Sequence, residues 1–230
     1  MTIAIIQFGG SNCDNDVLHV LQDVLGIEAE LVWYKEEKLD GYEAAVIPGG
    51  FSYGDYLRSG AIASRTPIMD AVRKLADNGK PVVGICNGFQ ILAESGLLDG
   101  ALTTNSYPKF KCEWSYLRVE NTNTPFTSMY AKGQVIRIPI AHKDGRYYHD
   151  DTSLQQLEDN NQVVFRYVDE KGNPSEDVNP NGSRNNIAGI INSKGNVLGM
   201  MPHPERASET IIGSDDGLLI FKSMVESGRK

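Results

Sequence analysis

Short apolar runs alternate with amphipathic segments through the first 96 residues, and this alternation constrains the fold more than any other feature. The runs have the length and β-branched content of buried strands, while the segments between them carry apolar residues at helical spacing. Strands separated by helices and joined by short loops predict a parallel sheet with helices on both faces. The expected strands are Ile3–Phe8, Ile27–Trp33, Ala44–Ile47 and Val82–Ile85, and the expected helices are Asp16–Leu25, a segment from Thr66-Pro67 to Asn78-Gly79, and a segment from Cys86 to Ser95-Gly96.

The chain past Ala101 has a different pattern, with strand-like runs, turns and little helix. We expect these runs to form an antiparallel extension of the sheet or a small hairpin layer packed on it. The polar stretch Asp169–Asn186 predicts a surface loop. With 230 residues and a hydrophobic content of 40%, the chain (1–230) is expected to form a single α/β domain. The expected strands are Tyr116–Val119, Val135–Ile140, Val163–Tyr167, Ile187–Ile191 and Val197–Met200, and a closing helix is expected at Asp215–Val225.

Charge, hydropathy and cysteine content exclude several classes of function. The net charge of −8 argues against a nucleic-acid partner. No apolar run approaches transmembrane length, and Met1–Gln7 lacks the features of a signal peptide, so we expect no membrane partner and a cytoplasmic location. Three cysteines without Cys-x-x-Cys spacing indicate neither a disulfide framework nor a cysteine zinc site. The four histidines form no closely spaced pair, so no metal site is expected.

Cys86 stands where an apolar strand meets a helix, within Gly84-Ile-Cys86-Asn-Gly-Phe-Gln90. This is the arrangement of a nucleophile elbow, with sulfur in place of a serine oxygen. The flanking glycines permit the sharp turn, and the positive end of the following helix favours the thiolate. An isolated cysteine that closes an apolar strand is more often a small buried hydrophobe. The catalytic interpretation therefore depends on the flanking glycines and Gln90, and it requires a partner base.

His203 and Glu205 lie directly after another apolar strand, in Met201-Pro-His203-Pro-Glu205-Arg206. The prolines predict an extended segment, in which residues two apart point the same way. The Glu205 carboxylate could then hold the imidazole in one tautomer, as the third group of a nucleophile–base–acid relay does. Alone, the tripeptide is equally consistent with a proline-braced exposed turn.

A glycine pair, Gly49-Gly50, follows the expected strand Ala44–Ile47. Glycines let backbone N–H groups approach a ligand closely, and such donors stabilise the oxyanion that forms when a carbonyl is attacked. In an elbow enzyme one donor is the amide after the nucleophile, here Asn87, and the second comes from a neighbouring loop. Gly50 is the candidate for that second donor. Without Cys86, a plain glycine turn explains the pair equally well.

Together these three segments resemble the class I (triad) glutamine amidotransferases. The family's elbow pattern, Gly-x-Cys-x-Gly-x-Gln, is matched by Gly84-Ile-Cys86-Asn-Gly-Phe-Gln90, and its His-x-Glu pair by His203 and Glu205. Its glycine-pair oxyanion loop is matched by Gly49 and Gly50. The resemblance implies a flavodoxin-like three-layer α/β sandwich, mainly parallel, with an antiparallel extension in the second half.

Within that family, the chain is similar to the glutaminase subunits of phosphoribosylformylglycinamidine synthases. The similarity extends from Ser11-Asn-Cys-Asp14 to the last helix and includes Gly49–Arg58, Pro139–His142 and Gly199–Arg206. Two pairs depart from the expected pattern. Gly9-Gly10 stands in place of Pro-Gly, and Lys143-Asp144 follows His142 in place of Gly-Glu.

The resemblance implies a mechanism and a set of partners. Cys86 would attack the side-chain amide of L-glutamine, His203 oriented by Glu205 would move the protons, and Gln90 would shape the glutamine site. The ammonia would pass to a synthetase subunit that acts on formylglycinamide ribonucleotide, with a small accessory subunit in the complex. ATP and Mg²⁺ are expected on the synthetase, and no cofactor is expected in this chain, which has no Gly-x-x-x-x-Gly-Lys phosphate loop.

Two alternatives stay open at this point: a stand-alone hydrolase on the same scaffold, and a non-catalytic assembly module. Gln90 and the glycine pair speak against the first, and the retained cysteine, histidine and acid speak against the second. The roles of five further residues are not assigned by the sequence; they are Cys13, Cys112, His142, Arg58 and Arg206.

Overall fold

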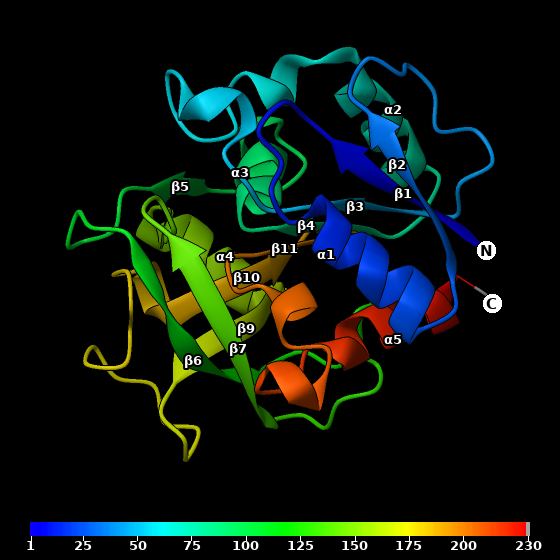
Figure 1. The fold of residues 1–230 in the computed structure, drawn as a ribbon. Coiled ribbons are helices and arrows are strands. Elements are labelled where there is room, and N and C mark those ends of the chain that lie inside the picture. The colour runs from blue at the N-terminus through cyan, green and yellow to red at the C-terminus, as the bar shows by residue number, and fades with distance from the viewer. Residues whose placement is uncertain (229–230) are drawn as a thin grey trace.

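A mixed β-sheet runs through the molecule (Figure 1), whose computed structural model describes residues 1–228. In this range the sheet has nine strands. Five neighbouring strands are parallel, and the remaining four continue the sheet in antiparallel fashion. Their order is β2 (Glu28–Trp33), β1 (Thr2–Gln7), β3 (Ala44–Ile47), β4 (Val82–Ile85), β11 (Val197–Met200), β10 (Ile187–Ile191), β9 (Val163–Val168), β6 (Lys111–Val119) and β7 (Val135–His142).

Helices cover both faces of the parallel half. The chain moves one way along the sheet from β1 to β2 and the other way from β3 to β4, so right-handed crossovers place the connecting helices on opposite faces. In Figure 1, α2 (Pro67–Asp77) and α3 (Asn87–Glu94) lie above the sheet, and α1 (Asp14–His19) and α5 (Leu218–Ser227) lie below it. The helix of α1 continues as a π-helical segment, Val20–Val24.

The central strands are buried throughout, as expected for strands covered on both faces. Gly88, in the first turn of α3, lets that helix lie against β3. A Cβ atom at this position would come 2.0 Å from the carbonyl oxygen of Ile47. This close approach brings the positive end of α3 to the ends of the central strands.

Most elements match the sequence-based expectations, and the bounds of β3, β4, β10 and β11 are those predicted. The antiparallel strands extend the main sheet, which settles the choice between the two arrangements considered for the second half. The expected helix at Asp215–Val225 is α5, and 169–186 is a loop that ends in a 3-10 turn, Arg184–Asn186.

The expectation of little helix in the second half was wrong in one place. Helix α4 (Asp151–Asp159) was missed because only Leu154 and Leu157 are buried, which gives a weak apolar stripe. The sequence feature that could have predicted this helix is its N-cap residue, Asp150, whose side chain accepts a hydrogen bond from the backbone N–H of Ser153.

Strand β6 begins at Lys111 rather than Tyr116. Its first residues were missed because Cys112 and Glu113 are exposed and this part of the strand shows no apolar alternation. A two-stranded sheet was also missed, formed by β5 (Ala101–Thr103) and β8 (Arg146–Tyr148).

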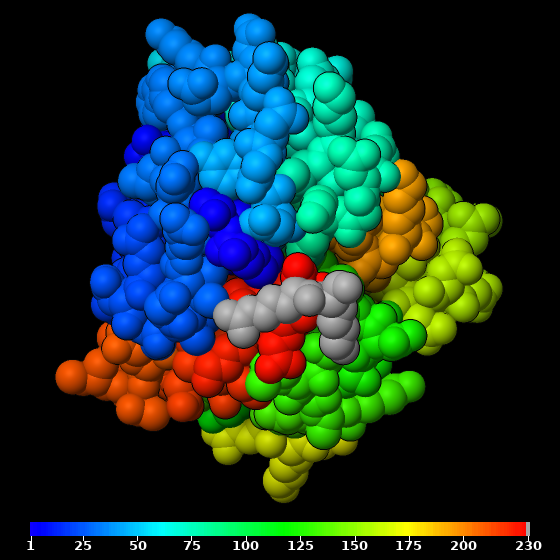
Figure 2. Space-filling view, turned by 90° about the vertical axis from the view of Figure 1, so that its right-hand side faces the viewer, coloured from blue at the N-terminus to red at the C-terminus, as the bar shows by residue number. Residues whose placement is uncertain are grey.

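Strand β1 and helix α5 meet on the face shown in Figure 2, where blue and red surfaces adjoin. The side chain of Met1 lies against Gly228, such that a Cβ atom there would be 2.6 Å from the Met1 methyl carbon. Among the helices of residues 1–228, none has the length and apolar character needed to cross a membrane.

Candidate active site

Three neighbouring parallel strands deliver the three predicted motifs to one edge of the sheet. The register pairs Ile47 of β3 with Gly84 of β4, and Ile85 of β4 with Met200 of β11. Because these strands run in the same direction, the segments that follow them emerge side by side. The backbone N–H of Cys86 donates to the carbonyl of Met200 at 2.8 Å, which ties the cysteine to the strand before His203.

Cys86 occupies a strained turn between β4 and α3. Its backbone has φ 52° and ψ −105°, in a region that non-glycine residues rarely adopt. The side chain is buried, with 5% of the residue exposed, and Sγ lies 3.6 Å from the carbonyl oxygen of Ala141. This geometry is the nucleophile elbow that the sequence predicts, with the sulfur at the start of a helix.

His203 and Glu205 form a buried pair. The imidazole Nδ1 and the carboxylate Oε1 are 2.6 Å apart, and 2% and 3% of the two residues are exposed. The predicted contact between Glu205 and the imidazole is present, but the prediction of an extended backbone for this segment was wrong. Pro204–Arg206 is a 3-10 turn rather than an extended segment, and that turn brings the carboxylate back to the ring.

The electrostatic surroundings of His203 favour its charged form. Burial alone would lower the pKa of this imidazole, but the carboxylate of Glu205 and the sulfur of Cys86 raise it well above the usual value. The other ring nitrogen, Nε2, is buried and has no hydrogen-bond partner within residues 1–228. An imidazole fixed at Nδ1 by a carboxylate and free at Nε2 is arranged for proton transfer.

Gly49 lies directly against this imidazole, and Gly50 lies against the backbone of the loop that contains Gly10. A Cβ atom at Gly49 would come 2.7 Å from Cε1 of His203, so only glycine leaves room for the ring. Gly50 has φ 152°, and a Cβ atom there would come 2.5 Å from the carbonyl oxygen of Gly10. Close packing therefore restricts both positions to glycine, at Gly49 through the His203 side chain and at Gly50 through a neighbouring backbone segment.

Asn87 and Gln90 connect this loop to the elbow. The Asn87 side chain accepts a hydrogen bond from the backbone N–H of Ser52 at 3.1 Å and donates to Gln90 at 2.9 Å. Gln90 in turn donates to the main-chain oxygen of Asp144 at 2.6 Å. Asn87 is also the first residue of α3, where N–H groups have no intrahelical acceptor. Its backbone amide is thus available to an oxyanion.

Two residues that the sequence left unassigned also belong to the site. Sγ of Cys13 lies 3.8 Å from Nδ1 of His203, and the Arg206 guanidinium donates to the same sulfur at 3.1 Å. The sequence places Cys13 near the end of the first expected strand, close to where the site forms, but a packed thiol was the favoured interpretation and the contact with His203 was not predicted.

The other three unassigned residues have different surroundings. His142 is buried, with Asn105 and Asn181 near its ring nitrogens, so it does not present a side chain to a partner. Arg58 is exposed and pairs with Glu94 at 2.6 Å, away from the triad. Cys112 is exposed.

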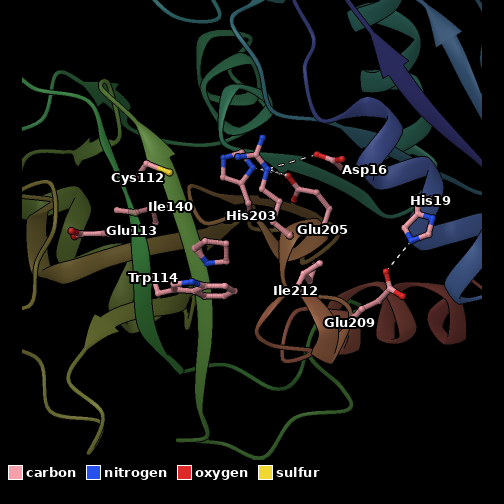
Figure 3. A pocket seen from close by; sticks show the side chains of 12 residues that line it. Asp16, His19, Cys112, Glu113, Trp114, Ile140, His203, Glu205, Glu209 and Ile212 are labelled. Carbon is pink, nitrogen blue, oxygen red and sulfur yellow. Dashed lines mark hydrogen bonds and ion pairs between the residues drawn. The ribbon is translucent and has the colours of Figure 1, made fainter.

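A cavity of about 660 Å³ reaches His203 and Glu205 between strand β7 and helix α1 (Figure 3). Carboxylates are prominent in its wall, and Cys86 is not among its lining residues. The described lining residues are Asp16, His19, Cys112, Glu113, Trp114, Pro139, Ile140, His203, Glu205, Arg206, Glu209 and Ile212.

Comparison with known proteins places the chain among the glutamine amidotransferases. Residues 1–217 match the family model of the CobB/CobQ-like glutamine amidotransferase domain, and the chain belongs to this family. The predicted class of protein and its fold are thereby confirmed.

More specific relatives cover the whole length. The chain is 66% identical to phosphoribosylformylglycinamidine synthase subunit PurQ of Methanosarcina mazei, over 98% of this chain and 97% of that protein. It is 55% identical to the subunit of the same name from Methanocaldococcus jannaschii, over 100% of both. The structure of PurLQS from Thermotoga maritima superposes with a TM-score of 0.87 at 49% identity, over 98% of both chains.

Proposed function

We propose that this chain is the glutaminase subunit of a phosphoribosylformylglycinamidine synthase in purine biosynthesis. The single observation that supports the chemistry is the placement of Cys86 and of the bonded pair His203–Glu205 at the ends of two adjacent parallel strands. Full-length similarity to subunits of that name at 55–66% identity supports the particular reaction. The nine-stranded sheet, which takes strands from both halves of the chain, supports a single glutamine amidotransferase domain.

The proposed first step is attack of the Cys86 thiolate on the side-chain amide carbon of glutamine. The carbonyl oxygen becomes an oxyanion, which the backbone N–H groups of Gly50 and Asn87 stabilise. A donor of this kind contributes about 10²–10³-fold to the rate in enzymes that use it. The C–N bond then breaks, the leaving nitrogen takes a proton from Nε2 of His203, and ammonia departs from a glutamyl thioester.

The second step releases glutamate. Nε2 of His203, now unprotonated, accepts a proton from water, whose oxygen attacks the thioester carbon. The C–S bond breaks, and the proton held by the imidazole returns to sulfur or solvent. Throughout, Glu205 holds Nδ1 and so keeps the reactive lone pair on Nε2. Gln90 orders the loops around the site through Asn87 and Asp144 rather than transferring protons.

Ammonia is useful only if a synthetase consumes it. The proposed partners are therefore the synthetase subunit and a small accessory subunit, with ATP and Mg²⁺ bound on the synthetase. The reacting groups are nearly closed to solvent in the isolated chain, where Cys86 and His203 are 5% and 2% exposed. Docking would open the site, so glutaminase activity should be low until the partner binds. The three free cysteines support a cytoplasmic location as part of this proposal.

The test is Cys86→Ala in the assembled synthase, assayed with glutamine and, separately, with added ammonia. We expect glutamine-dependent synthesis to fall by at least about 10⁴-fold, because the nucleophile is lost. Ammonia-dependent synthesis should stay within twofold of the unmodified complex. Loss of both activities would show that the cysteine is structural. Failure of a glutamine-analogue electrophile to label Cys86 in the complex would favour a non-catalytic module, and turnover of peptides in place of glutamine would favour a stand-alone hydrolase.

A further inference from the structure

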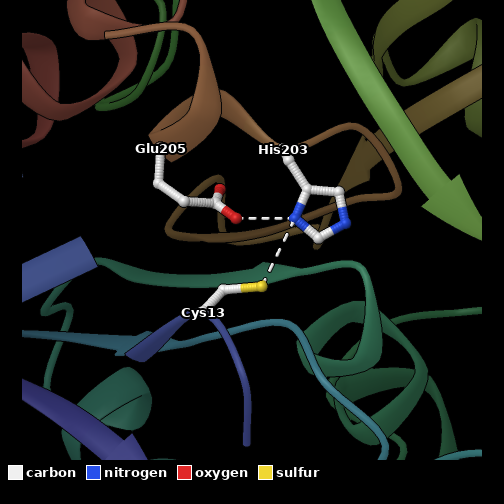
Figure 4. Close-up of side chains that lie close together, drawn as sticks. All are labelled: Cys13, His203 and Glu205. Atoms are coloured by element: carbon white, nitrogen blue, oxygen red, sulfur yellow. Dashed lines mark hydrogen bonds and ion pairs between the residues drawn. The ribbon is translucent and has the colours of Figure 1, made fainter. Parts of the chain in front are cut away.

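Cys13, His203 and Glu205 bring three kinds of metal-ligating atom together beneath the cavity (Figure 4). Sγ of Cys13, an imidazole nitrogen of His203 and a carboxylate oxygen of Glu205 all lie within 4.8 Å of one another, and all three residues are buried. Thiolate, imidazole and carboxylate are the ligands that Zn²⁺ takes in proteins. From this juxtaposition we propose that the three residues form a site for Zn²⁺, and that the bound ion switches the glutaminase off.

The distances are close to those that a tetrahedral ion requires. Zn–S and Zn–N bonds of usual length place sulfur and nitrogen roughly 3.5 Å apart at a tetrahedral angle. Sγ of Cys13 and Nδ1 of His203 are 3.8 Å apart. The Nδ1–Oε1 separation of 2.6 Å must widen toward roughly 3.3 Å as the ion replaces the shared proton. The second carboxylate oxygen of Glu205 is buried and has no hydrogen-bond partner within residues 1–228, so a ligand atom is free to turn toward the ion.

The cavity supplies an access route with suitable charge. Asp16, Glu113 and Glu209 line it together with Glu205, and such a concentration of carboxylates attracts cations. Its inner end is the imidazole–carboxylate pair itself. A water molecule entering by the same route can occupy the fourth position of the ion.

Arg206 contacts the Cys13 sulfur in the absence of the ion. Its guanidinium donates to Sγ of Cys13 at 3.1 Å, and its Nε lies 3.7 Å from a carboxylate oxygen of Asp16. Since the Arg206 side chain is 38% exposed, it can leave the sulfur for Asp16 when the cation binds. The thiol proton of Cys13 is then released to solvent as the S–Zn bond forms.

The switch follows from the two nitrogens of one imidazole. When Nδ1 binds the ion, a neutral imidazole carries its single proton on Nε2. A neutral ring is a much weaker acid than the imidazolium that gives its Nε2 proton to the leaving nitrogen in the proposed first step. Without that transfer Nε2 has no lone pair to accept a proton from water in the second step, and Glu205 is held by the ion rather than by the ring. Inhibition therefore rests on the proposed role of His203, whereas binding of the ion does not.

Binding is tested by titrating the full chain with Co²⁺, which takes zinc sites and gives a thiolate charge-transfer band in the near ultraviolet. We expect the band to reach its maximum at one Co²⁺ ion per chain, and to disappear when one equivalent of Zn²⁺ replaces the Co²⁺. Cys13→Ser should lose the band and weaken Zn²⁺ binding by more than about 100-fold, since even outer contacts of metal sites are worth 10–100-fold. The control Cys112→Ser, which removes an exposed thiol lining the same cavity, should keep it. A band that persists in Cys13→Ser, or that depends on Cys86 or Cys112, would overturn the site.

If Cys13→Ser does not fold, X-ray absorption of the zinc-loaded unmodified chain identifies the ligands of the ion directly. One sulfur at about 2.3 Å with nitrogen and oxygen near 2.0 Å supports the site, and a shell without sulfur overturns it. In the assembled synthase, stoichiometric Zn²⁺ should remove at least 90% of glutamine turnover, and a chelator should restore it. Binding with unchanged turnover would overturn the switch and count against the proposed role of His203. Normal turnover without binding would overturn the metal site alone.

Discussion

The parallel and antiparallel halves of the sheet contribute different chemical groups to the site. In the parallel half, each functional side chain follows within a few residues of a strand end, at the edge where β3, β4 and β11 finish. The antiparallel half contributes main-chain carbonyl oxygens instead, whereas the proposed backbone N–H donors, Gly50 and Asn87, also belong to the parallel half. The carbonyl oxygen of Ala141 lies 3.6 Å from Sγ of Cys86, and that of Asp144 accepts from Gln90 at 2.6 Å.

The difference explains which positions tolerate change. A strand end that presents a reactive side chain requires that residue type, whereas a backbone carbonyl can be presented by almost any residue. Lys143-Asp144 departs from the subfamily's expected Gly-Glu, yet the hydrogen bond from Gln90 is made to a main-chain atom. The departure therefore leaves that contact in place.

After loss of the nucleophile itself, the largest expected effect is in the parallel half, from Glu205→Gln. The side chain keeps its shape, but an amide can donate to Nδ1 of His203 and so select the tautomer with Nε2 protonated. We expect kcat for glutamine hydrolysis in the complex to fall about 10³–10⁴-fold. Steady-state kinetics check this, with Glu209→Gln as the matched control, because Glu209 pairs with His19 at 2.9 Å instead. A loss below tenfold would break the assignment of the triad acid.

A smaller effect is expected where the glycine loop meets the ring. In Gly49→Ala the added methyl group would lie 2.7 Å from Cε1 of His203, so the imidazole or the loop must shift. We expect a loss of about 100-fold in kcat/KM, since small misplacements of reacting groups cost about this much. Gly9→Ala is the control, because nothing lies within 4 Å of its added methyl group. Equal kinetics for the two variants would show that the close approach is not functional.

The smallest effect is expected in the antiparallel half, and it concerns stability rather than rate. Burial lowers the pKa of His142 to about 3, from 6.5 for a solvated imidazole. Because the folded pKa is depressed, the neutral ring stabilises the fold above pH 6.5, and this contribution is lost as the pH falls toward 3. Linkage gives a loss of about 2 kcal/mol by pH 5.

Urea unfolding at pH 7 and pH 5 measures this loss, and His142→Gln isolates it from other titrating groups. The variant should be less stable at pH 7 but should lose about 2 kcal/mol less than the unmodified chain on acidification. Identical pH dependence in both proteins would mean that His142 titrates normally in the folded state.

The same contrast between the halves determines what the sequence could predict. Cys86, His203 and Gly49 were predicted as site residues because a few adjacent residues are enough to indicate the turn that follows a strand. The contact between Cys13 and His203 depends on the packing of α1 against the turn after β11, and no local pattern encodes it. The 3-10 turn at Pro204–Arg206 was missed because proline allows both extended and helical geometry, and tertiary contacts select between them. In the antiparallel half, exposed strand residues such as Glu113 lack the apolar alternation on which prediction depends.

The exposure of Cys112 has a practical consequence. The other two cysteines, Cys13 and Cys86, are buried, so a bulky maleimide dye would attach selectively at the rim of the cavity. Such a fluorophore sits beside the route to the imidazole without touching the nucleophile. Its emission would register anything that covers or widens this part of the cavity.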